Sequence, residues 1–292
     1  MNKRALNKFY DKNHKIILIL PAILIILSLF YLYNFNQINN DFIYKDVSLT
    51  GGTSATIPGN IDMTDLGNYL DGKLEDVNMR KIYDIVTKEE KAVVIETKST
   101  PEETKQVLED YLGYELTTEN SSFEYTGSTL SENFYQQLLI ALLIAFIFMA
   151  FVVFILFRTL VPSTAVIISA FADILMTLVA VDLLGMKLST AGIVAFLMLM
   201  GYSVDTDILL TTRVLKRQGA SINNKIYGAF KTGIMMSLTS IVAIAFALII
   251  ARSFSSTLNQ IFTILLIGLL FDIFNTWITN AAIIKWYAEK KK

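Results

Sequence analysis

The chain has 292 residues, of which 53% are hydrophobic and only 17% charged, and its formal net charge is -1. Its apolar runs of about eighteen or more residues indicate a polytopic membrane protein rather than a soluble domain. The lack of cysteine excludes thiolate catalysis, disulfides and cysteine metal sites, and the single histidine, His14, leaves too little for a histidine-based metal cluster. A near-neutral chain also offers no global basic field for nucleic acid.

Six apolar windows, each close to the ~20 residues that cross a bilayer, predict six spanning helices surrounded by membrane lipid. They are Ile16–Tyr33, Leu138–Phe157, Pro162–Leu184, Thr190–Leu210, Phe230–Ala251 and Leu258–Ile284. The first window resembles a signal peptide because basic residues precede it. It is too long for one and lacks a small-residue cleavage site, so we expect an uncleaved anchor.

Basic residues gather at the two termini and at the connections on one side of the predicted bundle. They are Lys3, Arg4, Lys8, Lys12, Lys15, Arg158, Arg213, Lys216, Arg217, Lys225, Lys231, Lys285 and Lys290 to Lys292. The positive-inside rule makes this side cytoplasmic. We therefore expect both termini in the cytoplasm of a multi-pass cell-membrane protein, with the large insertion between the first two helices outside.

That insertion, residues 36–137, is polar and has its own pattern of elements. The expected strands are Val47–Ile57, Val77–Ile85, Ala92–Thr97 and Ser121–Tyr125, and the expected helices are Met63–Leu74 and Pro101–Leu112. The order β-α-β-β-α-β predicts a ferredoxin-like α+β domain. The chain then divides into residues 1–35, 36–137 and 138–292. Asn120 begins a glycosylation sequon on the predicted outer face.

Four aspartates lie inside the predicted spans, and each would cost several kcal/mol if it faced lipid. They are Asp173, Asp205, Asp207 and Asp272. We expect them to face the bundle interior, a partner subunit or water. Plain interhelical hydrogen bonding remains an alternative for each, above all for Asp272, which has Asn275 close by.

Asp205 and Asp207 point about 200° apart on a helix, so they cannot share one proton. Asp207 forms a polar stripe with Ser203 and Thr211, whereas Asp205 lies with Gly201 on nearly the opposite side. Two faces of the fourth helix therefore meet polar surroundings. This predicts a helix that is central or lies against another polytopic subunit; the alternative places one acid in a cytoplasmic water-filled vestibule.

Several motifs along almost the whole chain occur together, and in this order, in one known family. The segment Gly201-Tyr202-Ser203-Val204, followed by acids and Arg213, resembles the fourth helix of the SecF family of protein-export subunits. The other matching motifs are Thr50-Gly51-Gly52-Thr53 at the start of the insertion, Asp173 in the third helix, Leu188-Ser189-Thr190 before the fourth, and Phe271 to Thr276, which looks like the archaeal form of the sixth.

The resemblance implies half of a resistance-nodulation-division type membrane fold, with a SecD partner supplying the other six helices. The pair would assist the SecY channel in moving secretory polypeptides outward and would draw on the ion gradient. It implies an ion or proton relay through Asp173, Asp205 and Asp207. It also implies partner or assembly contacts by Asp272, Asn275, Tyr202 and Ser203, and a domain signature at Gly51, Gly52 and Thr53.

Two other functions remain open on the residues alone. One is a resistance-nodulation-division type exporter of lipids or small molecules, which would normally need larger external domains and both halves in one chain or a homodimer. The other is a structural subunit whose acids only hold a partner. The phosphate-binding pattern G-x-x-x-x-G-K-[ST] does not occur, so we expect no ATP hydrolysis, no cofactor and no enzymatic activity.

Overall fold

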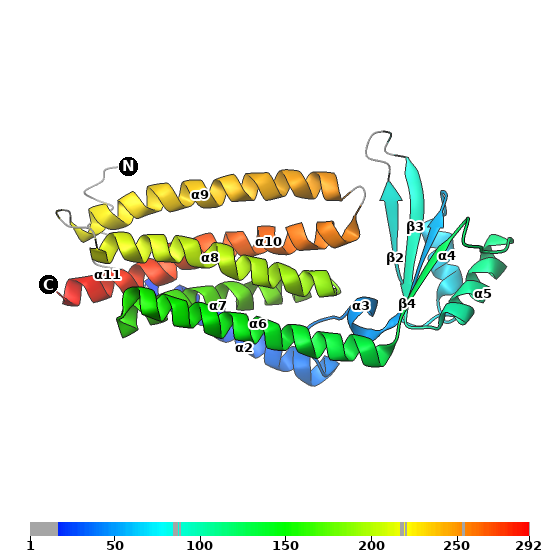
Figure 1. Ribbon diagram of the computed structural model, residues 1–292, viewed down its shortest axis with the longest axis horizontal. Coiled ribbons are helices and arrows are strands. Elements are labelled where there is room, and N and C mark those ends of the chain that lie inside the picture. Colours follow the sequence, from blue (N-terminus) through cyan, green and yellow to red (C-terminus); the bar gives the residue numbers. More distant parts are fainter. Residues whose placement is uncertain are drawn as a thin grey trace.

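The computed structural model describes residues 17–83, 87, 89–216, 219, 221–252 and 255–291 (Figure 1). It consists of a long helical bundle and a sheet domain (residues 52–126) at one end of that bundle. The expected cytoplasmic residues Lys3, Arg4, Lys8, Lys12, Lys15, Arg217 and Lys292, together with His14, lie outside the described residues.

Six helical segments of the described chain are long and apolar enough to cross a membrane, which confirms the predicted number. They are α2 (Ile19–Asn39), α6 (Ser128–Phe157), α7 (Leu160–Leu183), α8 (Thr190–Lys216), α9 (Ile222–Ala251) and a last run made of α10 (Ser256–Phe274), η1 (Asn275–Asn280) and α11 (Ala281–Lys290). Helices α6 and α9 begin well before their predicted windows, because their polar first turns continue the helix beyond the apolar stretch.

Helices α7 and α8 form the centre of the bundle. In each of them 56% of the most apolar stretch is buried, against 6% in α6 and 11% in α9. Close packing of α8 depends on a small residue in α10: a Cβ atom at Gly268 would lie 2.4 Å from both methyl carbons of Leu199. The central position expected for the fourth helix therefore agrees with the structure, and α6 and α9 present broad apolar faces.

The sheet domain has four antiparallel strands in the order β2-β3-β1-β4, and Figure 1 shows α4 and α5 on the same side of them. The elements are β1 (Gly52–Pro58), α4 (Met63–Leu70), β2 (Asn78–Tyr83), β3 (Glu90–Thr97), α5 (Pro101–Leu112) and β4 (Ser122–Thr126). Successive side chains of a strand point to opposite faces of the sheet. On one face, residues such as Ile57 and Ile95 form an apolar core with Leu66 and Leu108. This topology confirms the ferredoxin-like prediction.

The expected strand Val47–Ile57 is wrong over its first residues, which form the short helix α3 (Val47–Thr50). The Asp46 carboxylate caps this turn by accepting the Val47 N–H. Gly51 then adopts φ +83°, which L side chains rarely tolerate, and the strand begins at Gly52. Helix α4 also ends at Leu70 rather than Leu74.

The predicted Gly-Gly signature marks a place where backbones come very close. A Cβ atom at Gly51 would lie 2.5 Å from the Cα of Ser128, the first residue of α6, and one at Gly52 would lie 2.3 Å from the Thr97 carbonyl oxygen. The Thr53 hydroxyl donates to the Ser99 carbonyl (2.7 Å). The signature therefore lies where the chain enters the sheet domain, next to the point where it leaves the domain into α6. A side chain at either glycine would not fit there.

The sheet domain rests on the loop between α7 and α8. The Leu188 N–H donates to the Tyr44 carbonyl (2.6 Å) and the Asp46 N–H donates to the Leu188 carbonyl (3.0 Å), as in a parallel β-bridge. The Lys187 ammonium forms an ion pair with Asp76 (2.5 Å). This loop leads directly into α8, so the position of the domain is tied to the start of the central helix.

Candidate functional site

The candidate site is a cluster of three buried carboxyl groups in the middle of the bundle, which we call the acid cluster. Asp173 comes from α7, Asp207 from α8 and Asp272 from α10, and their exposed fractions are 0%, 0% and 1%. Ionisable residues inside spanning helices are rare and expensive, and they usually mark ion or substrate paths. The three acids lie on the three helices that pack most closely around the centre.

Asp173 joins all three helices through neutral donors. The Ser203 hydroxyl of α8 donates to one of its carboxylate oxygens, and the Asn275 amide of η1 donates to the other (2.7 Å). All three residues are buried. A carboxyl group held this way can gain or lose a proton without breaking an ion pair, but each change alters bonds to two helices.

Asp207 and Asp272 have similar surroundings. Asp207 accepts from the Ser169 hydroxyl of α7 (3.2 Å) and from the Asn280 amide (2.8 Å). Asp272 accepts from Thr206 of α8 (3.0 Å) and from Thr276 one turn further on (3.1 Å). None of the three acids forms an ion pair with a described lysine or arginine, so neutral donors alone surround them.

The π-helix η1 supplies half of these donors and was not predicted from the sequence. Its i→i+5 hydrogen-bonding pattern brings residues five apart toward the same side, and Asn275 and Asn280 have that spacing. Asn275 then reaches Asp173 and Asn280 reaches Asp207. Two buried asparagines spaced by five in an apolar helix were the available signal. Single-turn π-helices often occur at functional sites.

The structure separates the two aspartates of α8, as their spacing predicts. Asp207 is buried with Ser203 and Thr211, whereas Asp205 is exposed on the same side as Gly201 and Tyr202. Asp205 is therefore not part of the acid cluster. Because the described residues leave it exposed on a spanning helix, it needs another polar surface or water there.

The structure places Asp272, Asn275 and Ser203, which we expected at a partner contact, inside the bundle of this chain. All three are buried among helices of this chain, and their hydrogen bonds are to other buried residues of the bundle. None of the three side chains is therefore exposed for a partner to contact. Tyr202, with 44% of its side chain exposed, remains available for such a contact. In the described residues no group of three His, Cys, Asp or Glu side chains is placed to hold a metal ion.

Fold and site together define the class: a polytopic membrane protein with a six-helix bundle, an acidic centre and a ferredoxin-like domain after the first helix. The family model "Protein export membrane protein SecD/SecF, C-terminal" matches residues 106–290. The chain is 41% identical over 287 residues to the protein-export membrane protein SecF of Methanocaldococcus jannaschii, covering 94% of this chain and 96% of that one. The chain belongs to the SecF family of protein-export membrane proteins.

Other comparisons agree. The SecF protein of Methanothermobacter thermautotrophicus is 37% identical over 284 residues, which cover 95% of this chain and 94% of that protein. The crystal structure of SecDF, a translocon-associated membrane protein from Thermus thermophilus, matches 94% of this chain with a TM-score of 0.73 at 18% identity. This chain spans only 38% of that SecDF chain, and the likeness shows a shared fold.

Proposed function

We propose that this chain is the SecF half of a SecD–SecF pair that assists the SecY channel in exporting secretory polypeptides. Support comes from the names of its relatives and from the SecDF chain, of which it matches only a part. A separate SecD subunit would supply the remaining helices of a resistance-nodulation-division type fold. The proposed role is in transport, with no enzymatic step.

The acid cluster is the observation that carries an ion-coupled mechanism. One charge that crosses 100 mV supplies about 2.3 kcal/mol. A proton that enters the cluster changes the bonds of Asp173 to α8 and η1 together. We assign the relay to Asp173 and Asp207, with Asp272 beside them, and we assign Asp205 and Tyr202 to contact with SecD.

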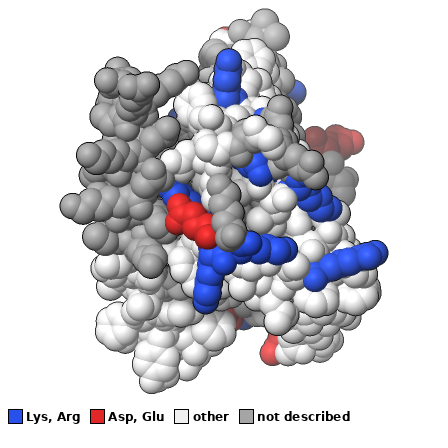
Figure 2. All heavy atoms as spheres, turned by 90° about the vertical axis from the view of Figure 1, so that its left-hand side faces the viewer, with Lys and Arg blue, Asp and Glu red and all other residues white. Residues whose placement is uncertain are grey.

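The orientation that we propose follows from the basic end of the bundle. Figure 2 shows Lys and Arg side chains gathered on the end of the bundle opposite the sheet domain. That end carries the α6–α7 and α8–α9 connections and the C-terminal residues of α11. The positive-inside rule then places both termini in the cytoplasm and residues 36–137 outside the cell.

Asp173→Asn tests the relay, because asparagine keeps the size and hydrogen-bonding capacity of aspartate but cannot ionise. We expect it to assemble with SecD yet lose export stimulation by an imposed proton or sodium gradient in reconstituted vesicles. Asp207→Asn should retain part of the stimulation, because it leaves Asp173 in place. Asp110→Asn, the same change at an exposed position in the sheet domain, is the control and should behave as wild type.

Three results would contradict the proposal in different ways. Full gradient stimulation in Asp173→Asn would remove the relay and leave a structural role for the acids. Self-association without SecD in mild detergent would favour an exporter over an export subunit. A complex with SecD that shows no ion dependence in the wild type would leave the partnership standing and remove the coupling.

A further inference from the structure

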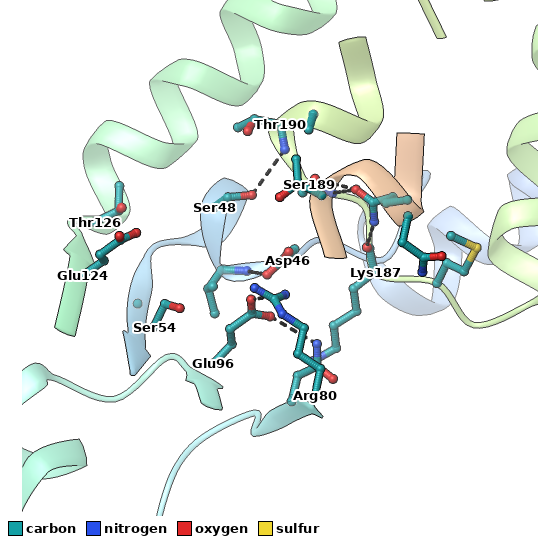
Figure 3. Close-up of a pocket in the computed structure, with 18 of the residues that line it drawn as sticks. Asp46, Ser48, Ser54, Arg80, Glu96, Glu124, Thr126, Lys187, Ser189 and Thr190 are labelled. Carbon is teal, nitrogen blue, oxygen red and sulfur yellow. Dashed lines mark hydrogen bonds and ion pairs between the residues drawn. The ribbon is translucent and has the colours of Figure 1, made fainter. Parts of the chain in front are cut away.

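A polar cavity of about 530 Å³ separates the sheet domain from the helical bundle (Figure 3). One wall is the face of the sheet that α4 and α5 leave uncovered, with Ser54, Arg80, Glu96 and Glu124. The other wall comes from the α7–α8 loop and the start of α10. A movement of the domain relative to the bundle must change this cavity.

Two carboxyl groups from opposite sides of this junction lie beside one another (Figure 3). Asp46 belongs to the bundle side, because its N–H donates to the Leu188 carbonyl of the α7–α8 loop (3.0 Å). Glu96 belongs to the domain side, in the inner strand β3, and only 4% of it is exposed. Repulsion between them would therefore act across the junction.

Among the described residues, only one of these two carboxyl groups forms an ion pair. Arg80 of β2 forms an ion pair with Glu96 (2.5 Å), and the Asn78 amide donates to its other oxygen (3.2 Å). Lys187 of the α7–α8 loop is paired with Asp76, which also holds Lys98 (3.2 Å). Glu124 of β4, on the same cavity wall, adds negative charge. One proton on the pair leaves Asp46, Glu96 and Arg80 neutral as a group.

Burial is the main cause that raises the pKa of both carboxyl groups above their ordinary values of 3.8 and 4.5. The negative charge of Asp46 raises the pKa of Glu96 further. The Val47 N–H and Arg80 act in the other direction on Asp46 without reversing the shift. The docked arrangement therefore binds a proton more tightly than the separated groups do.

We propose that Asp46 and Glu96 share one proton and form a pH-sensitive latch between the sheet domain and the bundle. With the proton present, the two carboxyl groups hydrogen-bond and the domain is docked. When the proton leaves, two carboxylates face one guanidinium in a buried place, and the domain separates from the α7–α8 loop. The latch concerns this chain alone and does not require the export role.

The sign of the pH dependence follows from the raised pKa values. Docking binds protons, so it is strongest below the ordinary values and weakens as the pH rises through the raised ones. Within that window, the ratio of docked to undocked molecules falls by up to about tenfold per pH unit for one proton. The pKa of Asp76 is shifted in the opposite direction. Burial raises it, but hydrogen bonds from Lys187 and Lys98 outweigh burial and leave the pKa lowered. The ion pair between Asp76 and Lys187 therefore weakens only when the pH falls below 3.8.

The chain lacks cysteine, so two introduced cysteines allow specific spin labelling. Glu102→Cys in α5 and Thr257→Cys at the start of α10, both exposed, report the distance between domain and bundle in the full chain in nanodiscs. Between pH 5 and pH 9 we expect a docked population at low pH and a second, longer distance that grows as the pH rises. This range stays above the pH at which Asp76 is protonated.

Variants at the two carboxyl groups decide whether they are the latch. Glu96→Gln and Asp46→Asn each remove one charge but keep the hydrogen bond, and asparagine also keeps the cap of α3. We expect both variants to remain docked from pH 5 to pH 9. Glu124→Gln, on the same cavity wall but outside the pair, should retain the wild-type response.

Three results would overturn the latch. The first is a wild-type distance that does not change with pH. The second is a wild-type pH response in Glu96→Gln and Asp46→Asn. The third is a domain that is undocked at pH 5 in both variants, because a pair with one negative charge should hold the domain as the singly protonated pair does.

Discussion

At the scale of single residues, the acid cluster is notable for its hydroxyl and amide partners. A carboxylate beside arginine stays ionised, whereas one beside serine, threonine and asparagine can change its protonation state at lower cost. Thr206 shows the consequence, because its hydroxyl lies between Asp272 (3.0 Å) and Thr276 (3.4 Å) and can rotate to suit either state. This environment is the one that the proposed proton relay requires.

The first prediction concerns Gly51, whose left-handed backbone and close neighbour can be tested separately. Gly72 has a similar φ (+73° against +83°), but a Cβ atom added there would meet no other atom within 4 Å. Gly72→Ala should therefore cost only the left-handed strain, about 1–2 kcal/mol. Gly51→Ala should cost about 2–5 kcal/mol, because the Ser128 backbone must also move.

Native-state hydrogen exchange of β3 in the full chain measures both free energies of opening. If the two variants cost the same, the approach of Gly51 to Ser128 does not constrain the domain. Membrane insertion should remain normal in both variants, since neither position lies in a spanning helix.

At the scale of elements, the contact between α8 and α10 can be tested at Gly268. A Cβ atom there meets the whole end of the Leu199 side chain, with the nearest atoms at 2.4 Å. We expect Gly268→Ala to destabilise the bundle by about 1–3 kcal/mol, as overpacking does. Gly201→Ala meets nothing within 4 Å and should be neutral or stabilise the helix by up to about 1 kcal/mol.

A double variant gives the decisive comparison for this contact. Leu199→Ala should reverse part of the loss in Gly268→Ala, because it removes the atoms that collide. The stabilities of the wild type, the two single variants and the double variant are measured by thermal unfolding in one detergent, with tryptophan fluorescence as the signal. Additive effects of the two changes would mean that the two residues do not interact.

The sequence predicts elements where a pattern is local and fails where tertiary contacts decide. Hydropathy alone places six helices, and period-two alternation with the Pro101 helix start places the ferredoxin-like elements. It also predicts that Asp205 and Asp207 face apart, since this needs only the helix repeat. The π-turn of η1 and the short α3 also make contacts with distant parts of the chain: Asn275 of η1 donates to Asp173, and Ser48 of α3 accepts from the Thr190 N–H.

The same reason explains why the buried positions of Asp272 and Asn275 were not predicted. Which face of the last helix points inward depends on the rotation of α7, α8 and α10 about their axes. The amino-acid composition does not determine that rotation. Asp272 and Asn275 looked as suited to another subunit as to this one. Only their packed positions show that Thr206 and Asp173 are their partners.

At the scale of the whole molecule, we predict that the exposed stripe of α8 holds SecD. Asp205→Ala removes a polar group that the membrane leaves unsatisfied and that SecD would bind. Interhelical hydrogen bonds in membranes contribute about 0.6–1.7 kcal/mol, so we expect affinity for SecD to fall about 3- to 20-fold. Titration of labelled SecD in mild detergent measures this. Asp272→Asn, enclosed in the bundle, is the control and should bind normally.

Helix α6 reaches from the basic end of the bundle to the foot of the sheet domain without interruption, over 30 residues. At 1.5 Å per residue it is about 45 Å long, roughly 15 Å more than the hydrocarbon layer needs. The excess forms a stalk whose first residue touches Gly51. A rigid rod of this length acts as a lever: a tilt of about 10° at the basic end of the bundle sweeps its other end through about 8 Å. A small tilt of α6 within the bundle would therefore displace the sheet domain by several ångströms.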